Sequence, residues 1–207
     1  MTAKPQAPAA ERNKRPILEI LMTEFRDCES VLEIGSGTGQ HAVFFAGAMP
    51  WLVWQTSDLA ENHAGIRSWI AESGLTNVRD PLLLNVEEPG DMAGEYHGVF
   101  SANTAHIMNS QAVPCMFDLI GRLLSDNGVF CLYGPFNQDG KFSSVSNQQF
   151  DESLRRQDPE MGIRDLADLD EFASRSMMRR DNLFAMPANN LLAVWRRTEI
   201  GKENDPS

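Results

Sequence analysis

The chain has 207 residues, 42% of them hydrophobic and 23% charged, which is typical of one globular domain with its own core. Its 15 glycines, 11 prolines and three cysteines exclude collagen-like, low-complexity and disulfide-dense chains. A net charge of −11 makes the phosphate backbone of a nucleic acid an unfavourable partner.

Short apolar strands and amphipathic helices alternate along most of the chain. Residues 1–10 are rich in Ala and Pro, and we expect them to be mobile. Apolar residues at helical spacing predict a first helix that begins at Pro16. Strands are expected at residues 30–34, 52–56, 81–86, 98–102, 129–133, 177–185 and 191–197. Further helices are expected at residues 40–49, 61–73, 113–124, 146–156 and 168–174.

Local signals mark several boundaries between these elements. Residues 126–128, Asp-Asn-Gly, predict a turn before the fifth strand. Ser146 followed by Gln149 is typical of a capping box at a helix start. The alternation predicts an α/β, Rossmann-like, doubly wound sheet of seven strands, closed by an antiparallel hairpin around residues 187–190. We expect a single domain over residues 11–198 and a tail at residues 199–207.

A glycine-rich loop, VLEIGSGTGQ at residues 31–40, joins the first strand to a helix. Gln40 stands where a dinucleotide fingerprint has its third glycine, and the Gly-Lys-Ser/Thr ending of a P-loop is absent. Glu33 places a carboxylate beside the loop, which opposes a pyrophosphate and suits a cationic amine. This pattern favours S-adenosylmethionine (SAM) as the ligand. We expect the loop to bind it through Glu33, Gly35, Ser36 and Gly37.

Polar side chains also follow the next strands of the expected sheet. Asp58 lies about 20 residues past the glycines, where a carboxylate accepts hydrogen bonds from ribose hydroxyls. Asn85 and Val86 are expected to hold the adenine, and Asn103 stands at the mouth of the site. Simpler interpretations remain open: the glycine loop as a plain tight turn, Asp58 as a helix N-cap, and the two asparagines as turn formers.

With these motifs, the chain resembles the class I SAM-dependent methyltransferases and, more narrowly, the methyltransferase-like 26 type branch. The glycine loop carries the first resemblance; residues 11–14, Glu-Arg-Asn-Lys, and 186–190, Met-Pro-Ala-Asn-Asn, carry the second. The other matching segments are residues 74–78, 103–106, 133–136 and 162–165. The resemblance implies the strand order 3-2-1-4-5-7-6 and a SAM site that includes Glu33 and Asp58. Asn85 departs from the acidic residue usual in the branch.

Candidate residues for the methyl acceptor lie in the second half of the chain, with acceptor-side elements expected at residues 134–175. His106, Tyr133 and Arg164 are the catalytic candidates, as a general base, a polar tip at a strand end and a carboxylate partner. Asn137 and Asn189 are further candidates. Each also has a structural interpretation: a loop histidine, a core aromatic or a surface ion pair.

The segment before the first strand is expected to form a lid, with Arg12, Asn13 or Lys14 touching the methionine part of SAM or the acceptor. His41 is interpreted as structural or loosely cofactor-facing.

The sequence therefore predicts a SAM-dependent methyltransferase that acts on a small molecule and yields S-adenosylhomocysteine (SAH). The alternatives are a non-catalytic SAM-binding module and a protein methyltransferase; an NAD(P) oxidoreductase is disfavoured. The N-terminus lacks an apolar run behind a basic start, and the cysteines show no metal-ligand spacing. We expect a cytoplasmic protein with no nucleic acid, membrane or metal partner, and the oligomeric state stays open.

Overall fold

The computed structural model describes residues 4–198; residues 1–3 and the expected tail, residues 199–207, lie outside that range. The helices are α1 (Pro8–Glu24), α2 (Gln40–Ala48), α3 (His63–Ser73), α4 (Ala112–Leu123), α5 (Val145–Gln157) and α6 (Leu166–Arg175), with 3-10 turns at Ala60–Asn62 and Pro187–Asn189. The strands are β1 (Ser30–Ile34), β2 (Val53–Asp58), β3 (Val78–Leu83), β4 (Tyr96–Ala102), β5 (Leu124–Gly134), β6 (Phe136–Asn137), β7 (Arg164–Asp165), β8 (Met178–Met186) and β9 (Asn190–Arg197).

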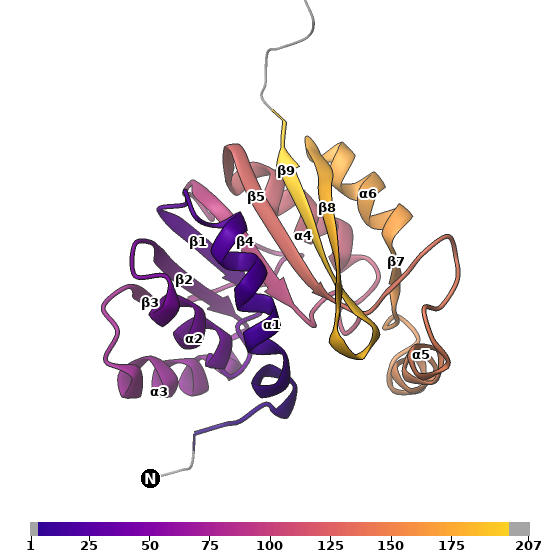
Figure 1. The fold of residues 1–207 in the computed structure, drawn as a ribbon, viewed down its shortest axis with the longest axis horizontal. Helices are drawn as coiled ribbons and strands as arrows, with labels where there is room; N and C mark the ends of the chain where they lie inside the picture. Colours follow the sequence, from indigo (N-terminus) through magenta and orange to yellow (C-terminus); the bar gives the residue numbers. More distant parts are fainter. Residues whose placement is uncertain (1–3, 199–207) are drawn as a thin grey trace, which may run out of the picture.

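A seven-stranded sheet in the order β3-β2-β1-β4-β5-β9-β8 forms the centre of the molecule (Figure 1). Strands β1 to β5 pair in parallel, β9 runs antiparallel to β5, and β8 runs antiparallel to β9. The two-residue strands β6 and β7 pair with each other in a separate small sheet. When β6 and β7 are left out and the other strands are renumbered along the chain, β8 becomes strand 6 and β9 becomes strand 7. The order of the main sheet is then 3-2-1-4-5-7-6, and the expected α/β, Rossmann-like fold is confirmed.

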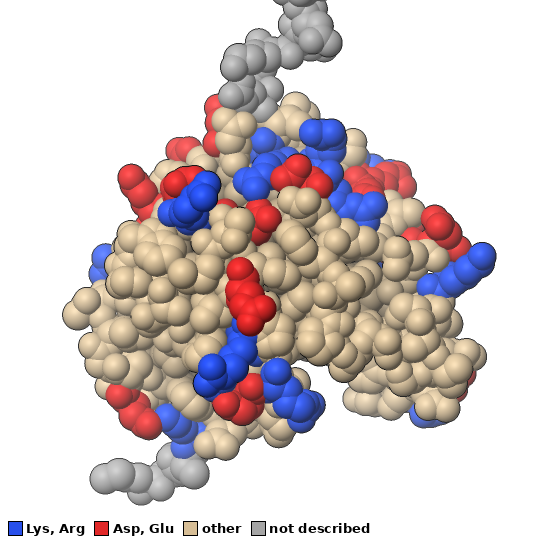
Figure 2. Space-filling view, in the orientation of Figure 1, with Lys and Arg blue, Asp and Glu red and all other residues tan. Residues whose placement is uncertain are grey.

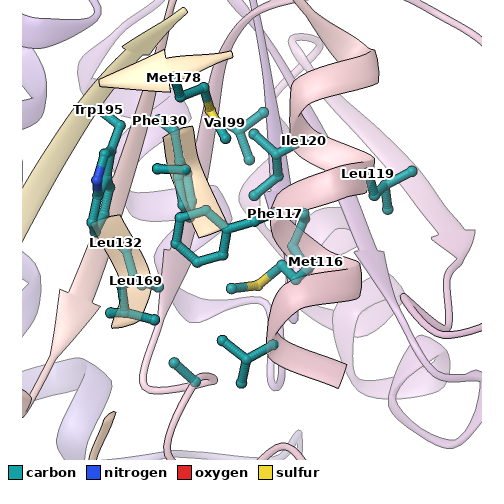
Figure 3. Close-up of a cluster of buried hydrophobic side chains, with 14 of the residues drawn as sticks. Val99, Met116, Phe117, Leu119, Ile120, Phe130, Leu132, Leu169, Met178 and Trp195 are labelled. Carbon is teal, nitrogen blue, oxygen red and sulfur yellow. The ribbon is translucent and has the colours of Figure 1, made fainter. Parts of the chain in front are cut away.

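Side chains that alternate along the strands fill a core on each face of the sheet. Helices α1 and α2 cover one face, where Phe45 and Trp54 pack with Phe100. Helices α4 and α6 cover the other face. There the Phe117 ring lies 5.4 Å from Phe130 and 5.5 Å from Trp195 (Figure 3). Both faces of the parallel strands are therefore buried, which accounts for their continuous apolar sequences.

The first helix is longer than its sequence pattern predicts. It begins at Pro8 and has Pro16 inside it, so residues 8–10 of the segment expected to be mobile form its first turn. Apolar periodicity fails to mark this turn because the side chains that α1 buries there, Ala10 and Asn13, are small or polar. Their burial depends on contacts with distant segments.

Strand β3 is displaced from the expected residues 81–86 to Val78–Leu83. It is an edge strand, and Leu83 is 70% exposed, so the apolar run there does not mark a buried strand. Leu84 then turns away with its N–H donating to the Asp58 carbonyl at 3.0 Å. The chain leaves β3 early enough for Asn85 and Val86 to lie in the loop after it.

Two further boundaries differ from the sequence prediction. The expected turn at residues 126–128 lies inside β5, where Asn127 takes a φ of 62° and the register with β4 shifts. Ser144, rather than Ser146, caps α5, because its side chain accepts a hydrogen bond from the Asn147 N–H at 3.1 Å.

Candidate functional site

A cavity of about 750 Å³ opens at the edge of the sheet where the parallel strands end. The glycine loop, the ends of β2 and β4, the loops that follow β3 and β4, and the N-terminal segment all contribute to its wall. Seven of the cofactor residues expected from sequence line it: Gly35, Ser36, Gly37, Asp58, Asn85, Val86 and Asn103. This position, outside the carboxyl ends of the strands, is where open α/β sheets bind ligands.

The glycine loop adopts a backbone that side chains would obstruct. Gly35 has a φ of +73°, and a Cβ there would lie 2.6 Å from Thr104 Cγ2. Gly39 has a φ of +88°, and its Cβ would lie 3.0 Å from the Ile66 backbone on α3. The loop therefore needs glycine for both its left-handed conformation and its close packing. The result is a tight bend that leads directly into the N-terminus of α2.

Asp58 ends β2 and faces this bend. Its Oδ2 accepts a hydrogen bond from the Gly37 N–H at 2.6 Å. Its Oδ1 accepts from the Leu59 N–H at 2.7 Å and from Asn62 Nδ2 at 2.8 Å. A carboxylate offers about four acceptor positions, so capacity remains for a ligand hydroxyl. Asp58 thus fixes the loop and stays available to the cavity.

The two asparagines after the strands are held by their own loops. Asn103 takes a φ of 59°, and its N–H donates to the Tyr133 carbonyl at 2.8 Å. Asn85 Oδ1 accepts from the Glu87 N–H at 3.1 Å. Both therefore act as turn formers, as their simpler interpretation suggests, and both also border the cavity.

Glu33 lies behind the loop, contrary to the expectation that it binds the ligand. It is 2% exposed, does not line the cavity, and its Oε2 accepts a hydrogen bond from Trp54 Nε1 at 3.1 Å. The pKa of Glu33 is raised to about 7, chiefly by burial and in smaller part by the negative charge of Asp58, while hydrogen bonds from Trp54 and Ser36 oppose the rise. Side chains along β1 alternate between the two faces of the sheet, and the face that Glu33 takes leads into the core beside Trp54.

Glu33→Gln should remove one component of the pH dependence of stability. The pKa of Glu33 is raised from 4.5 to about 7 in the folded protein. The protonated carboxyl therefore stabilises the folded protein fully below pH 4.5, and this stabilisation is lost as the pH rises through about 7. At about pH 8 the variant should be more stable than the wild type by up to about 3 kcal/mol, and at about pH 5 the difference should shrink. Urea unfolding of both proteins measures this, and parallel pH profiles would contradict the assignment.

The charges on the cavity wall are negative. Asp58, Glu61 and Glu87 line it, and no Lys or Arg among residues 4–198 does. A ligand with a pyrophosphate therefore finds no side-chain cation here, whereas a ligand with a net positive charge is favoured by the field.

A strap formed by residues 4–10 closes one side of the cavity, which Pro5, Ala7, Ala9 and Ala10 line. The Ala7 N–H donates to Gln40 Oε1 at 2.5 Å. Gln40 thus fills a structural role at the position where a dinucleotide fingerprint would have glycine.

The other end of the strap rests on α3. Trp69 Nε1 donates to the Pro5 carbonyl at 2.8 Å, and Lys4 lies over the Trp69 ring and pairs with Glu72 at 2.5 Å. Sequence reasoning missed the strap because its lining residues carry no functional side chains. The polar residues expected to form the lid, Arg12 and Lys14, do not line the cavity.

Asn13 and His41 join α1 to α2 next to the cavity. His41 lines the cavity, and its Nε2 lies 2.7 Å from Asn13 Oδ1, with both residues 8% exposed. Burial lowers the pKa of His41 to about 4, so its ring is neutral at pH 7. Asn13 also makes a hydrogen bond with the Tyr133 hydroxyl, whose pKa burial raises. Asn13 therefore organises the wall of the site and does not line it.

None of the three catalytic candidates lines the cavity. Tyr133 is 3% exposed, and His106 is 6% exposed with its ring against Phe150 at 5.3 Å. Burial, together with the positive charge of Arg164, lowers the pKa of His106 to about 4, which makes this imidazole a weak base at neutral pH.

Arg164 is engaged by the protein itself. Its Nε donates to the Ala105 carbonyl at 3.0 Å, and its Nη2 donates to the carbonyls of Met108 at 2.6 Å and Glu160 at 2.8 Å. The expected pairing with a substrate carboxylate is therefore replaced by a structural role that fixes the loop after β4.

Arg164→Met should lower the free energy of unfolding by about 2–3 kcal/mol, because three carbonyls lose a charged donor. Arg156→Met, on the exposed side of α5, is the matched control and should change stability by less than about 0.5 kcal/mol. Urea unfolding compares them. Equal stability of the two variants would show that Arg164 does not hold the loop.

Asn137 and Asn189, the two further acceptor-side candidates, lie outside the cavity lining. Asn137 Oδ1 is buried and has no hydrogen-bond donor within residues 4–198. Asn189 lies in the hairpin turn before β9, where its Nδ2 reaches Ser146 Oγ at 3.4 Å. The cavity also receives no residue from 134–175, the region expected to serve the acceptor.

Between residues 4 and 198, no helix combines the length and apolar character needed to cross a membrane. The same part of the chain contains no cluster of three or more His, Cys, Asp or Glu side chains suited to a metal ion.

The chain matches a protein-family model over nearly its whole length. A family model described as "Protein of unknown function (DUF938)" matches residues 4–197. The chain belongs to the DUF938 family. That match covers the strap, the glycine loop and the terminal hairpin, so all the elements around the cavity belong to the family domain.

Solved structures show the same fold at low sequence identity. An O-methyltransferase family protein from Burkholderia thailandensis superposes with a TM-score of 0.79 at 14% identity over 92% of this chain. The SAM-dependent methyltransferase SibL superposes with a TM-score of 0.78 at 18% identity over 92% of this chain. Human N-acetylserotonin methyltransferase in complex with SAM superposes with a TM-score of 0.71 at 13% identity over 92% of this chain. This chain spans 58%, 56% and 58% of those chains, respectively. The likeness shows the fold that this chain shares with them.

Proposed function

We propose that this protein is a SAM-dependent methyltransferase that transfers a methyl group to a small-molecule acceptor. One observation carries the proposal: Asp58 and the glycine loop face the same cavity, which has three carboxylates and no Lys or Arg of residues 4–198 in its wall. A ribose-binding carboxylate without a cation for phosphate suits a nucleoside that is itself positively charged. The narrower resemblance to the methyltransferase-like 26 type branch stays part of this proposal.

The residues that line the cavity fit SAM, and different lining segments would contact different parts of this ligand. Asp58 accepts from the ribose hydroxyls, and Val86 and Asn85 contact the adenine. The backbone of the glycine loop and the neighbouring hydroxyl of Ser36 receive the methionine end. The strap covers the opposite side and excludes water from the reacting atoms.

When bound, SAM supplies a methyl group on a positively charged sulfur. The protein contributes alignment and exclusion of water, and holding the partners in near-attack geometry contributes about 7–11 kcal/mol to lowering a barrier.

Calorimetry with SAM, SAH and NAD tests the binding part of the proposal. We expect heat of association with SAM and with SAH, and none with NAD. Absence of binding to SAH up to millimolar concentration would contradict the proposal. Incubation with labelled SAM and a metabolite extract then tests transfer.

A non-catalytic SAM-binding module is the second candidate. The observation that favours it is the state of the three catalytic candidates: Arg164 is engaged by carbonyls, and His106 and Tyr133 are buried. Binding of SAM without transfer of label to any acceptor would support this module.

A further inference from the structure

The lining of the cavity carries charge of one sign at neutral pH. Asp58, Glu61 and Glu87 line it, and within residues 4–198 the lining contains no Lys or Arg. His41, which also lines it, is neutral at pH 7, because burial lowers the pKa of its ring to about 4. A bound ligand therefore meets a negative field that no cation of the lining offsets.

The cations of the elements next to the cavity are held outside it. Arg67 of α3 pairs with Asp80 at 2.8 Å. Lys4 of the strap pairs with Glu72 at 2.5 Å, and Arg12 of α1 is exposed and outside the lining. On the face of the molecule shown in Figure 2, by contrast, Lys and Arg lie beside Asp and Glu over α1 and near the start of β8 and the end of β9. The wall of the cavity thus differs from surfaces where both signs are mixed.

Glu61 and Glu87 have no partner in the protein. Both are exposed, and neither side chain makes a hydrogen bond or an ion pair with any of residues 4–198. Glu61 lies in the turn after β2 and Glu87 in the loop after β3, so the two carboxylates come from neighbouring strands. Asp58, in contrast, holds the glycine loop through the Gly37 N–H. The charges of Glu61 and Glu87 can therefore be removed without disturbing that loop.

Methyl transfer changes the charge of the ligand that such a wall would bind. SAM carries an ammonium, a carboxylate and a sulfonium, which leave one net positive charge. In the transfer, the lone pair of the acceptor atom bonds to the methyl carbon, while the carbon–sulfur bond breaks and its electron pair stays on sulfur. SAH is therefore a thioether without net charge. A negative wall attracts the reactant and not the product, and specificity is the difference between the two affinities.

We propose that Glu61 and Glu87 make the site selective for the positively charged cofactor over its neutral product. This inference rests on the proposed function. Two unit charges about 10 Å apart in water change an equilibrium by about twofold, so the two carboxylates together contribute about fourfold. Salt screens exposed charges over about 10 Å at about 0.1 M ionic strength, so the selectivity declines as salt is added. Weaker retention of SAH limits inhibition of the enzyme by its product.

Calorimetry at about 20 mM and about 500 mM salt tests the inference with SAM, SAH and a SAM analogue that carries an ammonium in place of the sulfonium. The variant Glu61→Gln/Glu87→Gln removes two charges from the wall. Its matched control, Glu19→Gln/Glu29→Gln, removes two exposed charges outside the lining. At low salt we expect the ratio of SAM affinity to SAH affinity to fall about fourfold in the first variant and to keep its wild-type value in the control. At high salt the fall should disappear, and the analogue should behave as SAM does.

Equal ratios in the wild type and both variants at low salt would overturn the inference, although SAM binding itself would stand. The same holds if the fall persists at high salt or if the analogue behaves as SAH does, because a contact with the methylated sulfur, and not charge, would then discriminate the ligands. Wild-type protein that binds neither SAM nor SAH would contradict the proposed function and remove the inference with it.

Discussion

Asp58→Ala should weaken SAM binding by about 100-fold or more, because hydrogen bonds to a charged group contribute about 1.5–3 kcal/mol each. The ribose loses its carboxylate, and the Gly37 N–H loses the partner that holds the glycine loop at 2.6 Å. Isothermal calorimetry with SAM and with SAH measures the change. Circular dichroism of the variant confirms that the fold is retained.

Two variants separate the roles of Asp58. Asp58→Asn keeps an acceptor oxygen for the loop and loses the charge, and we expect about a tenfold loss of affinity. Asp80→Asn, on the neighbouring strand β3, removes an exposed carboxylate that pairs with Arg67 of α3 outside the cavity, and affinity should stay unchanged. Equal affinity of Asp58→Ala and Asp80→Asn would show that the ribose does not bind at the end of β2.

Removal of residues 1–7 should weaken SAM binding by about tenfold, chiefly through faster dissociation, because closing segments retain ligands and exclude water. The deletion takes away Pro5 and Ala7, which line the cavity, and leaves Pro8 at the start of α1. Stopped-flow displacement of SAM by excess SAH measures the dissociation rate. Unchanged dissociation would mean that the strap is not part of the ligand-bound site.

A single substitution should reproduce part of this effect. A Cβ at Gly65 on α3 would lie 2.7 Å from Pro5 Cγ, so Gly65→Ala should displace the strap although alanine favours the helix by about 1 kcal/mol. Gly47→Ala on α2 is the matched control, since its Cβ would make an ordinary contact with Leu75 at 3.6 Å. We expect faster SAM dissociation in the first variant only. Equal rates in both would leave the strap without a role in retention.

The residues that line the cavity at the ends of β1 and β2 could be predicted from sequence because their signals are local. Gly35 and Asp58 each stand at the end of a strand that its own apolar residues identify, and parallel strands bring their ends to one edge. Boundaries were less predictable where burial depends on the sheet position, as at β3. Its apolar residues read as a buried strand, yet Leu83 is exposed because β3 lies at the sheet edge.

By itself, the sequence determined the alternation of strands and helices, the glycine bend and the carboxylate opposite it, because periodicity and backbone conformation depend on neighbouring residues. Only the tertiary structure decided that Glu33 binds Trp54 and that Arg164 binds carbonyls. It also placed Pro5, not Arg12, at the cavity. Those outcomes depend on partners far apart in the chain: Arg164 binds a carbonyl 59 residues away, and Trp69 binds one 64 residues away. Which polar group meets a ligand and which meets the protein is settled by packing, because a buried polar group takes the partner that the fold brings to it.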